Sequence, residues 1–167
     1  MAEEKLGTEA GSEETKTGQF APQKIYIKDL SFETPHSPEI FTEEWNPAVN
    51  MNIASEAKPI DEKLYEVVLT ITVTVTMEEK TAYLVEAHQA GIFHIDGFPE
   101  EIIDRMVATI CPNILFPFAR ELVADLVTRG GFPQLLLAPV NFEALYQQEQ
   151  RHQQKNVAAP TEAETKH

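Results

Sequence analysis

The side chains best suited to metal binding or nucleophilic chemistry are few and widely spaced. His88 and His94 lie six residues apart, and Cys111 is the single cysteine of the chain. A zinc site usually needs closer placement and at least a third ligand. Cys111 stands between Ile110 and Pro112, a setting typical of a small buried hydrophobic residue. We therefore interpret the histidines as surface residues and expect no metal site.

Motifs of enzymes are also missing from the sequence. It contains no glycine-rich phosphate loop, no HExxH and no GxSxG. Carboxylates are abundant, so a pair of them acting in glycoside hydrolysis stays open, although no spacing points to one. We expect no catalytic residue and no cofactor, and the pattern favours a binding protein over an enzyme.

The charge balance indicates which partners are compatible with the chain. It has 27 acidic residues against 13 lysines and arginines, a net charge of −14, and residues 21–146 alone carry −11. Such a surface repels nucleic acid and anionic membranes and attracts basic partners. The N-terminus has no signal-peptide pattern, and no continuous apolar run approaches the ~18 residues of a membrane span. We expect a cytoplasmic protein without direct membrane insertion.

Composition divides the chain into a domain between two tails. Residues 1–22 form an acidic segment that we expect to be disordered, and residues 148–167 form a polar tail, helical at its start and then frayed. Residues 23–147 are the predicted domain.

The domain begins with strand patterns. We predict strands over residues 25–32, 48–53, 69–76 and 81–95, with a proline-rich crossover between the first two. The strand over residues 69–76 alternates aliphatic residues with threonine. Short links between the later strands predict antiparallel pairing.

The period then changes to that of helices. Pro99 begins one helix, the segment Cys111-Pro112-Asn113 interrupts it, and a second helix ends at Gly130-Gly131. Asn141 is an N-cap for a last helix. The fold class is α+β, with a four-stranded antiparallel sheet and helices packed on one face.

Some apolar surface exceeds what one small sheet can cover. The helix around residues 114–126 is apolar on several sides, which predicts oligomerisation. Phe32, Phe41 and Trp45 lie in or beside the proline-rich crossover, where they either cap the sheet or form an apolar groove for extended peptides.

Several segments, in order, resemble the SecB family of bacterial export chaperones. The resemblance covers roughly residues 23–147, and its matching segments are residues 25–33, 65–69, 91–93, 111–121, 132–135 and 137–142. The most specific are Cys-Pro-Asn-Ile-Leu-Phe-Pro-Phe-Ala-Arg-Glu and the Phe-Pro-Gln-Leu segment with its following Leu-Ala-Pro-Val-Asn-Phe.

The resemblance implies a homotetramer, a dimer of dimers, that holds unfolded secretory precursor proteins without ATP or catalysis. It places a client-binding groove at Phe32, Phe41, Trp45, Val49 and Met51. It places docking of the export motor SecA, through that partner's basic zinc-bearing tail, at Asp29, Glu33, Leu84 and Glu86. A cluster of carboxylates around a leucine suits a basic segment.

The resemblance also implies an oligomer interface at Tyr83, Val85, Ala87 and Gln89. Val85 and Ala87 stand where the family has a cysteine and a larger aliphatic residue. Two alternatives stay open: a chaperone of the same fold dedicated to a toxin–antitoxin pair, and a small hydrolase.

Overall fold

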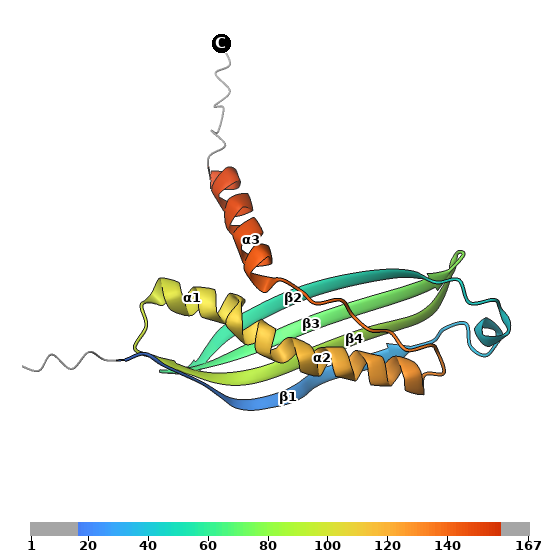
Figure 1. Ribbon diagram of the computed structural model, residues 1–167, viewed down its shortest axis with the longest axis horizontal. Helices are drawn as coiled ribbons and strands as arrows, with labels where there is room; N and C mark the ends of the chain where they lie inside the picture. The colour runs from blue at the N-terminus through green and yellow to red at the C-terminus, as the bar shows by residue number, and fades with distance from the viewer. Residues whose placement is uncertain (1–16, 158–167) are drawn as a thin grey trace, which may run out of the picture.

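A single four-stranded antiparallel sheet forms the body of the protein (Figure 1). The computed structural model describes residues 17–157. The strands are β1 (Gln19–Glu33), β2 (Ala48–Asp61), β3 (Leu64–Met77) and β4 (Lys80–Asp96), in the order β1-β4-β3-β2. The α+β fold expected from the sequence is therefore confirmed, with longer strands than the patterns predicted.

Alternation in β3 and β4 separates the sheet into two faces. The odd-numbered residues from Val67 to Met77 in β3 are buried, as are Tyr83, Val85, Ala87 and Phe93 in β4. Their neighbours on the opposite face are partly exposed, and in β3 most of these are threonines. We call the buried side the core face and the other side the outer face.

A β-bulge in β1 changes which residues reach each face. Ile27 pairs with Gln89 on the core face, but Asp29 pairs with His88 on the outer face. Lys28 is thus the extra residue. Without this shift Asp29 would share the face of Ile27, so the bulge brings the acidic end of β1 to the outer face.

Two helices cross the core face. Helix α1 spans Glu100–Ala108 and helix α2 spans Ile110–Arg129. The break lies at Thr109 (φ −125°, ψ −60°), whose hydroxyl and N–H both donate to the Arg105 carbonyl oxygen, at 2.7 and 3.0 Å. The predicted interruption at Cys111-Pro112-Asn113 is therefore wrong, since Pro112 fits the first turn of α2, where no intrahelical N–H bond is lost.

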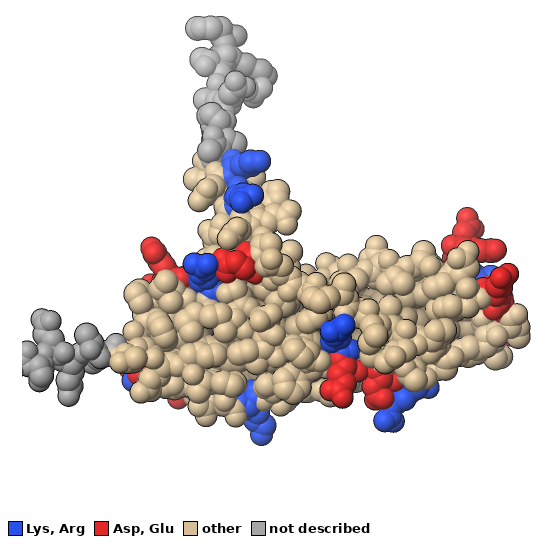
Figure 2. All heavy atoms as spheres, viewed as in Figure 1, with Lys and Arg blue, Asp and Glu red and all other residues tan. Residues whose placement is uncertain are grey.

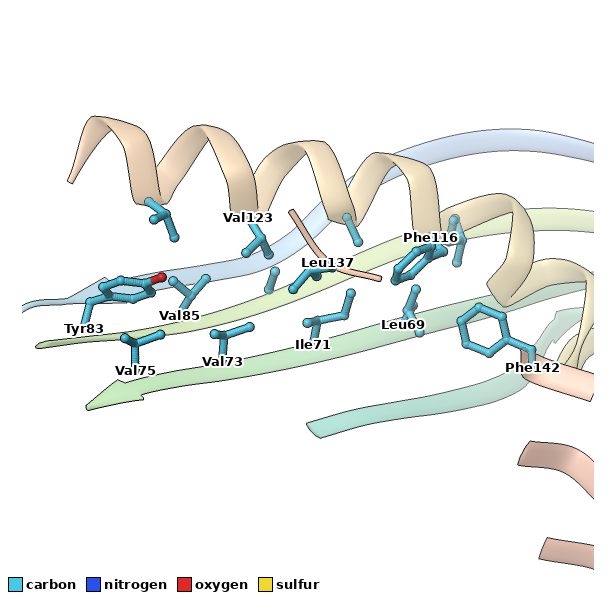
Figure 3. Packing of buried hydrophobic residues seen from close by; sticks show 14 of the residues in the cluster. Leu69, Ile71, Val73, Val75, Tyr83, Val85, Phe116, Val123, Leu137 and Phe142 are labelled. Carbon is cyan, nitrogen blue, oxygen red and sulfur yellow. The ribbon is translucent and has the colours of Figure 1, made fainter. Parts of the chain in front are cut away.

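The core lies between α2 and the strands. Leu115, Val123 and Val127 of α2 are fully buried against the aliphatic rows of β3 and β4 (Figure 3). By length and composition the stretch Glu100–Arg129 could also cross a membrane, at a mean hydropathy of 1.3. Its packing against the sheet is that of a core helix that is apolar on more than one side.

The C-terminal end of α2 is closed by a glycine motif. Gly131 has φ +88°, and the N–H groups of Gly131 and Phe132 donate to the carbonyls of Thr128 and Val127. This is the Schellman arrangement, which requires a residue that tolerates the left-handed conformation. It turns Phe132 back onto the sheet, where the ring is buried.

A linker over residues 133–141 then leads to α3 (Phe142–Val157), which projects from the body (Figure 1). Asn141 Oδ1 accepts a hydrogen bond from the Ala144 N–H at 3.0 Å, as expected of an N-cap. Arg105 ties α1 to α3 through Glu143, at 2.7 Å.

The predicted boundaries of the tails need one correction. β1 begins at Gln19, so residues 19–22 belong to the sheet, because they pair with the last residues of β4. Residues 1–16 and 158–167 lie outside the described residues.

Candidate functional site

The four residues assigned to docking share the outer face of the sheet. Glu33 pairs with Leu84, and Asp29 and Glu86 occupy neighbouring rows on β1 and β4. The adjoining strand β3 presents Thr70, Thr72 and Thr74 to the same rows. The structure therefore brings together all four sequence-predicted residues, Asp29, Glu33, Leu84 and Glu86, as an acidic patch around a leucine. We call these residues the acidic patch.

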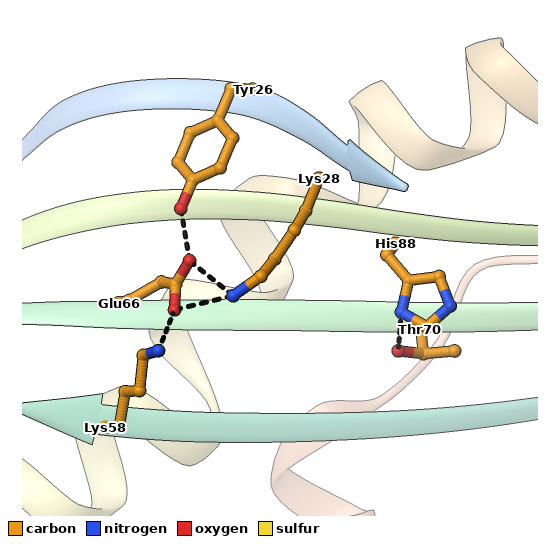
Figure 4. Close-up of polar contacts among 6 residues, drawn as sticks. All are labelled: Tyr26, Lys28, Lys58, Glu66, Thr70 and His88. Carbon is orange, nitrogen blue, oxygen red and sulfur yellow. Dashed lines mark hydrogen bonds and ion pairs between the residues drawn. The ribbon is translucent and has the colours of Figure 1, made fainter. Parts of the chain in front are cut away.

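The carboxylate of Glu86 has a fixed partner. His88 Nε2 lies 2.7 Å from Glu86 Oε1, and His88 Nδ1 lies 3.1 Å from Thr70 Oγ1 (Figure 4 shows the ring beside Thr70). The side chains of His88 and Glu86 are 27% and 46% exposed. Glu86 is thus accessible to a partner while one of its oxygens is already oriented.

A second charged group, the Glu66 cluster, lies on the same face. It consists of Glu66, Tyr26, Lys28 and Lys58. Lys28 Nζ binds both carboxylate oxygens of Glu66 at 2.8 and 2.9 Å, Lys58 Nζ lies 3.1 Å from Oε2, and the Tyr26 hydroxyl donates to Oε1 (Figure 4). The hydrogen bonds from Lys28 and then from Tyr26 lower the pKa of Glu66 to about 2. Burial, followed by the bond to Glu66, raises the pKa of Tyr26 to about 12.

The aromatic residues assigned to client binding converge at one end of the core face. Phe132 lies at their centre, with ring centroids 4.9 Å from Phe41, 5.7 Å from Trp45, 4.8 Å from Tyr83 and 6.4 Å from Phe32. Phe41 is 48% exposed, whereas Phe132 is buried. The cluster therefore caps the core and leaves apolar ring surface exposed. A groove for extended peptides at these residues stays a prediction.

Val49 and Met51 extend this apolar surface along β2. Val49 pairs with Val75, which pairs with Tyr83, while Met51 pairs with Val73 in the row that leads to Val85. Both lie on the core face, and they are 51% and 39% exposed. An exposed apolar strip thus runs from the aromatic cluster onto the edge strand.

The four residues assigned to the oligomer interface lie elsewhere than expected. Tyr83, Val85, Ala87 and Gln89 all point to the core face, and each is at most 4% exposed within the single chain. Gln89 Nε2 also donates to the Tyr26 carbonyl at 3.0 Å. These side chains have no surface to offer a second chain, which corrects the expectation of direct contact. An influence on assembly stays a prediction, and it would act through the position of α2.

The side chains considered first for chemistry are placed as follows. Cys111 is fully buried, and burial raises the pKa of its thiol to about 12, so the nucleophilic thiolate is disfavoured. His88 and His94 share the outer face. Within residues 17–157, no three His, Cys, Asp or Glu side chains are grouped in a way that could hold a metal ion.

Three features of these surfaces were not predicted from the sequence. Phe132, at the centre of the aromatic cluster, was identified only as part of the matching segment over residues 132–135. The Glu66 cluster joins residues 38 and 40 positions apart in the chain, which no local spacing reveals. The bulge had a signal in the sequence, because the apolar residues change parity from Ile25 and Ile27 to Leu30 and Phe32.

Comparison with known proteins connects this geometry to a family. The family model described as preprotein translocase subunit SecB matches residues 13–153. The chain belongs to the SecB family. The protein-export protein SecB of Nitrosococcus oceani is 55% identical over 161 residues, covering 95% of this chain and 98% of that protein. Its counterpart from Methylococcus capsulatus is 55% identical over 143 residues, covering 86% and 92%.

A solved structure supports the fold of this SecB family member. The SecB-like chaperone of Mycobacterium tuberculosis, solved in complex with an antitoxin peptide, has a TM-score of 0.58 at 18% identity. The match covers 73% of this chain and 91% of that one. At this identity the similarity concerns the fold alone.

Proposed function

We propose that this SecB family member is a cytoplasmic holding chaperone that binds unfolded secretory precursor proteins and transfers them to SecA. The observation that carries the proposal is the presence of two separate surfaces on one small domain. One is the exposed apolar strip of Phe41, Val49 and Met51 on the core face, and the other is the acidic patch on the outer face. The role needs neither ATP nor a catalytic group.

The apolar strip suits unfolded clients. Its exposed side chains are aromatic or aliphatic, and β2 is an edge strand whose outer main-chain groups are not paired with another described strand. Apolar and main-chain contacts recognise extended segments with little sequence specificity. This supports a protein that accepts many precursors while they are unfolded.

The acidic patch suits a basic partner. Its carboxylates lie on a face lined by threonines, and Leu84 adds an apolar side chain among them. Complementary charge speeds the encounter with a basic segment and fixes its orientation. The basic, zinc-bearing tail of SecA has this chemistry, and the zinc would belong to the partner.

Assembly into a dimer of dimers is part of the proposal. Ile27 of β1 and Phe118 of α2 line one open hollow, and they are 51% and 47% exposed. Figure 2 shows an uncharged stretch of surface between the charged side chains at the junction of α1 and α3 and those toward the C-terminal end of α2. A second copy covering this flank would remove apolar side chains from water.

The test is a substitution that separates the two surfaces. Glu86→Lys reverses one charge in the acidic patch and should weaken binding of the SecA tail about tenfold or more. Capture of an unfolded precursor should be nearly unchanged, because Glu86 lies on the face opposite the apolar strip. Both are measured by titration calorimetry on the same preparations.

Glu149→Lys is the matched control, since it makes the same change in charge at an exposed position on α3. It should leave both activities near those of the native chain. Equal loss of both activities in Glu86→Lys would argue against separate surfaces.

A chaperone dedicated to an antitoxin is the second candidate. The similar fold of the M. tuberculosis protein, solved with an antitoxin peptide, favours it. The presence of all four patch residues and the 55% identity to protein-export proteins support the export role instead. Binding of the SecA tail separates the two candidates.

A further inference from the structure

Glu86, one residue of the acidic patch, is held by a neighbouring side chain on the same strand. Glu86, His88 and Thr70 form a chain of hydrogen bonds that crosses from β4 to β3, with contacts of 2.7 and 3.1 Å. Asp29 on β1 is the residue paired with His88 on its other side. The imidazole therefore lies among the carboxylate that it binds, a second carboxylate and a hydroxyl.

The hydrogen-bonding roles follow from the chemistry of the partners. A carboxylate can only accept, so Nε2 must carry the proton that it donates to Glu86. In the neutral ring Nδ1 then accepts from the Thr70 hydroxyl. Both ring nitrogens are satisfied without a positive charge, so the neutral histidine orients Glu86 and leaves the charge of the patch intact.

The other charged groups near the imidazole do not take its place as the partner of Glu86. Lys28 follows the bulge beside Asp29, but its ammonium group is bound to both oxygens of Glu66. On β3 the residues paired with His88 and Glu86 are the uncharged Thr70 and Thr72. The groups that face the imidazole are thus Asp29 from β1, Glu86 from β4 and a hydroxyl from β3.

We propose that His88 is a positioning residue of the docking surface: it holds the Glu86 carboxylate, and Thr70 holds the ring. This inference rests on the proposed function, because it concerns docking of the basic SecA tail.

The test measures the dissociation constant for the zinc-loaded C-terminal segment of SecA at pH 8. Replacing His88 by leucine should raise this dissociation constant about fivefold. The loss would come from the missing N–H donor, because a neutral imidazole carries no charge. Thr70→Val keeps the β-branched shape and should raise it about two- to threefold. His88→Gln keeps an amide N–H donor for Glu86 and should bind almost like the native chain.

Two further readouts separate positioning from a merely structural role. His88→Leu combined with Glu86→Gln should bind no more weakly than Glu86→Gln alone, because the histidine acts through that carboxylate. Affinity should be retained in His88→Gln and lost in His88→Leu, because only the amide keeps an N–H donor for Glu86.

The outcomes distinguish this inference from the proposed function. If Glu86→Gln does not weaken binding, the proposed docking surface is wrong. If Glu86→Gln weakens binding but the His88 variants do not, or if the losses simply add in the double variant, the role of His88 is overturned. A His88→Gln variant that binds as weakly as His88→Leu would also overturn it, since the amide keeps an N–H donor for Glu86.

Discussion

Glu66 shows how a single acidic residue can be structural on a face whose other acids are available for docking. It is 7% exposed and accepts from two lysines and a tyrosine. Removing one partner of a buried charged group leaves the others unsatisfied. Glu66 also binds Lys28, the lysine next to Asp29, and so keeps that positive charge from the acidic patch.

Glu66→Gln should therefore destabilise the fold by about 1–3 kcal/mol at neutral pH. The pKa of Glu66 is lowered from 4.5 to about 2, so its ionised form stabilises the folded state above pH 4.5. That contribution is lost as the pH falls through the window from 4.5 to about 2. The measurement is urea unfolding of both proteins at several pH values.

Glu56→Gln is the control for this prediction, since Glu56 is an exposed residue of β2 on the same outer face of the sheet. It should change the free energy of unfolding by less than about 0.5 kcal/mol. A difference between Glu66→Gln and the native chain that stays constant down to pH 2 would contradict the role of the ionised carboxylate.

For single residues, the family resemblance predicted the face of the sheet better than the contacts that each side chain makes there. The resemblance identified Asp29, Glu33, Leu84 and Glu86, and the structure places them on one face. Simple alternation could not have placed Asp29 on the face of Glu86 with Ile27 on the opposite face, since that requires the bulge. Val85 and Ala87 lie on the face that alternation predicted. Only the position of α2 shows that the chain itself covers this face.

At the scale of elements, the end of α2 determines where the aromatic cluster forms. Gly131 adopts φ +88° so that Phe132 can turn back toward Tyr83 and Phe41. A Cβ atom added at Gly131 would also lie 3.2 Å from the ring of Phe41. The two glycines were predicted from the sequence as a helix end, whereas the aromatic partners come from three distant segments and could not be predicted.

Gly131→Ala should destabilise the fold by about 1–2 kcal/mol because alanine is strained at this positive φ. It should also weaken capture of unfolded clients, since the cluster around Phe132 is displaced. Thermal unfolding and client titration measure the two effects. Gly131→Asn should lose less stability, because asparagine tolerates the left-handed conformation. Equal losses in the two variants would show that crowding against Phe41, rather than backbone strain, is the cause.

The elements also show where local pattern is sufficient and where it is not. The strict alternation over residues 69–76 predicted a strand and its buried face, and both are present in β3. The helix break was predicted in the wrong place because Pro112 was expected to interrupt the helix, although proline is tolerated in the first turn of α2. The break lies at Thr109, whose hydroxyl donates to the Arg105 carbonyl oxygen. The full length of β2 was missed because residues 54–61 are exposed and lack a clear apolar period.

At the scale of the whole molecule, the exposed apolar surface is divided between two uses. We expect the strip along β2 to bind clients and the flank formed by Ile27 and Phe118 to bind a second copy. Burial in the single chain supports the division, since α2 packs its core-facing residues on the sheet and leaves Phe118 at 47% exposure.

Phe118→Glu should therefore reduce the mass of the assembly in solution while the helical content of each chain stays the same. A buried carboxylate at an apolar interface is unfavourable, but the same side chain is accommodated on an exposed flank. Light scattering and circular dichroism are the measurements. Val157→Glu, at an 87% exposed position of α3, is the control and should leave the mass unchanged. An unchanged mass in Phe118→Glu would place the interface elsewhere.

The central claim is tested most directly by the solution mass of the native chain, measured by light scattering with and without a reduced, unfolded precursor. We predict a mass near four times the 18.8 kDa of one chain. That assembly should take up the unfolded precursor and ignore its folded form. A monomer that binds neither form would contradict the account, leaving the SecB fold without the proposed chaperone function.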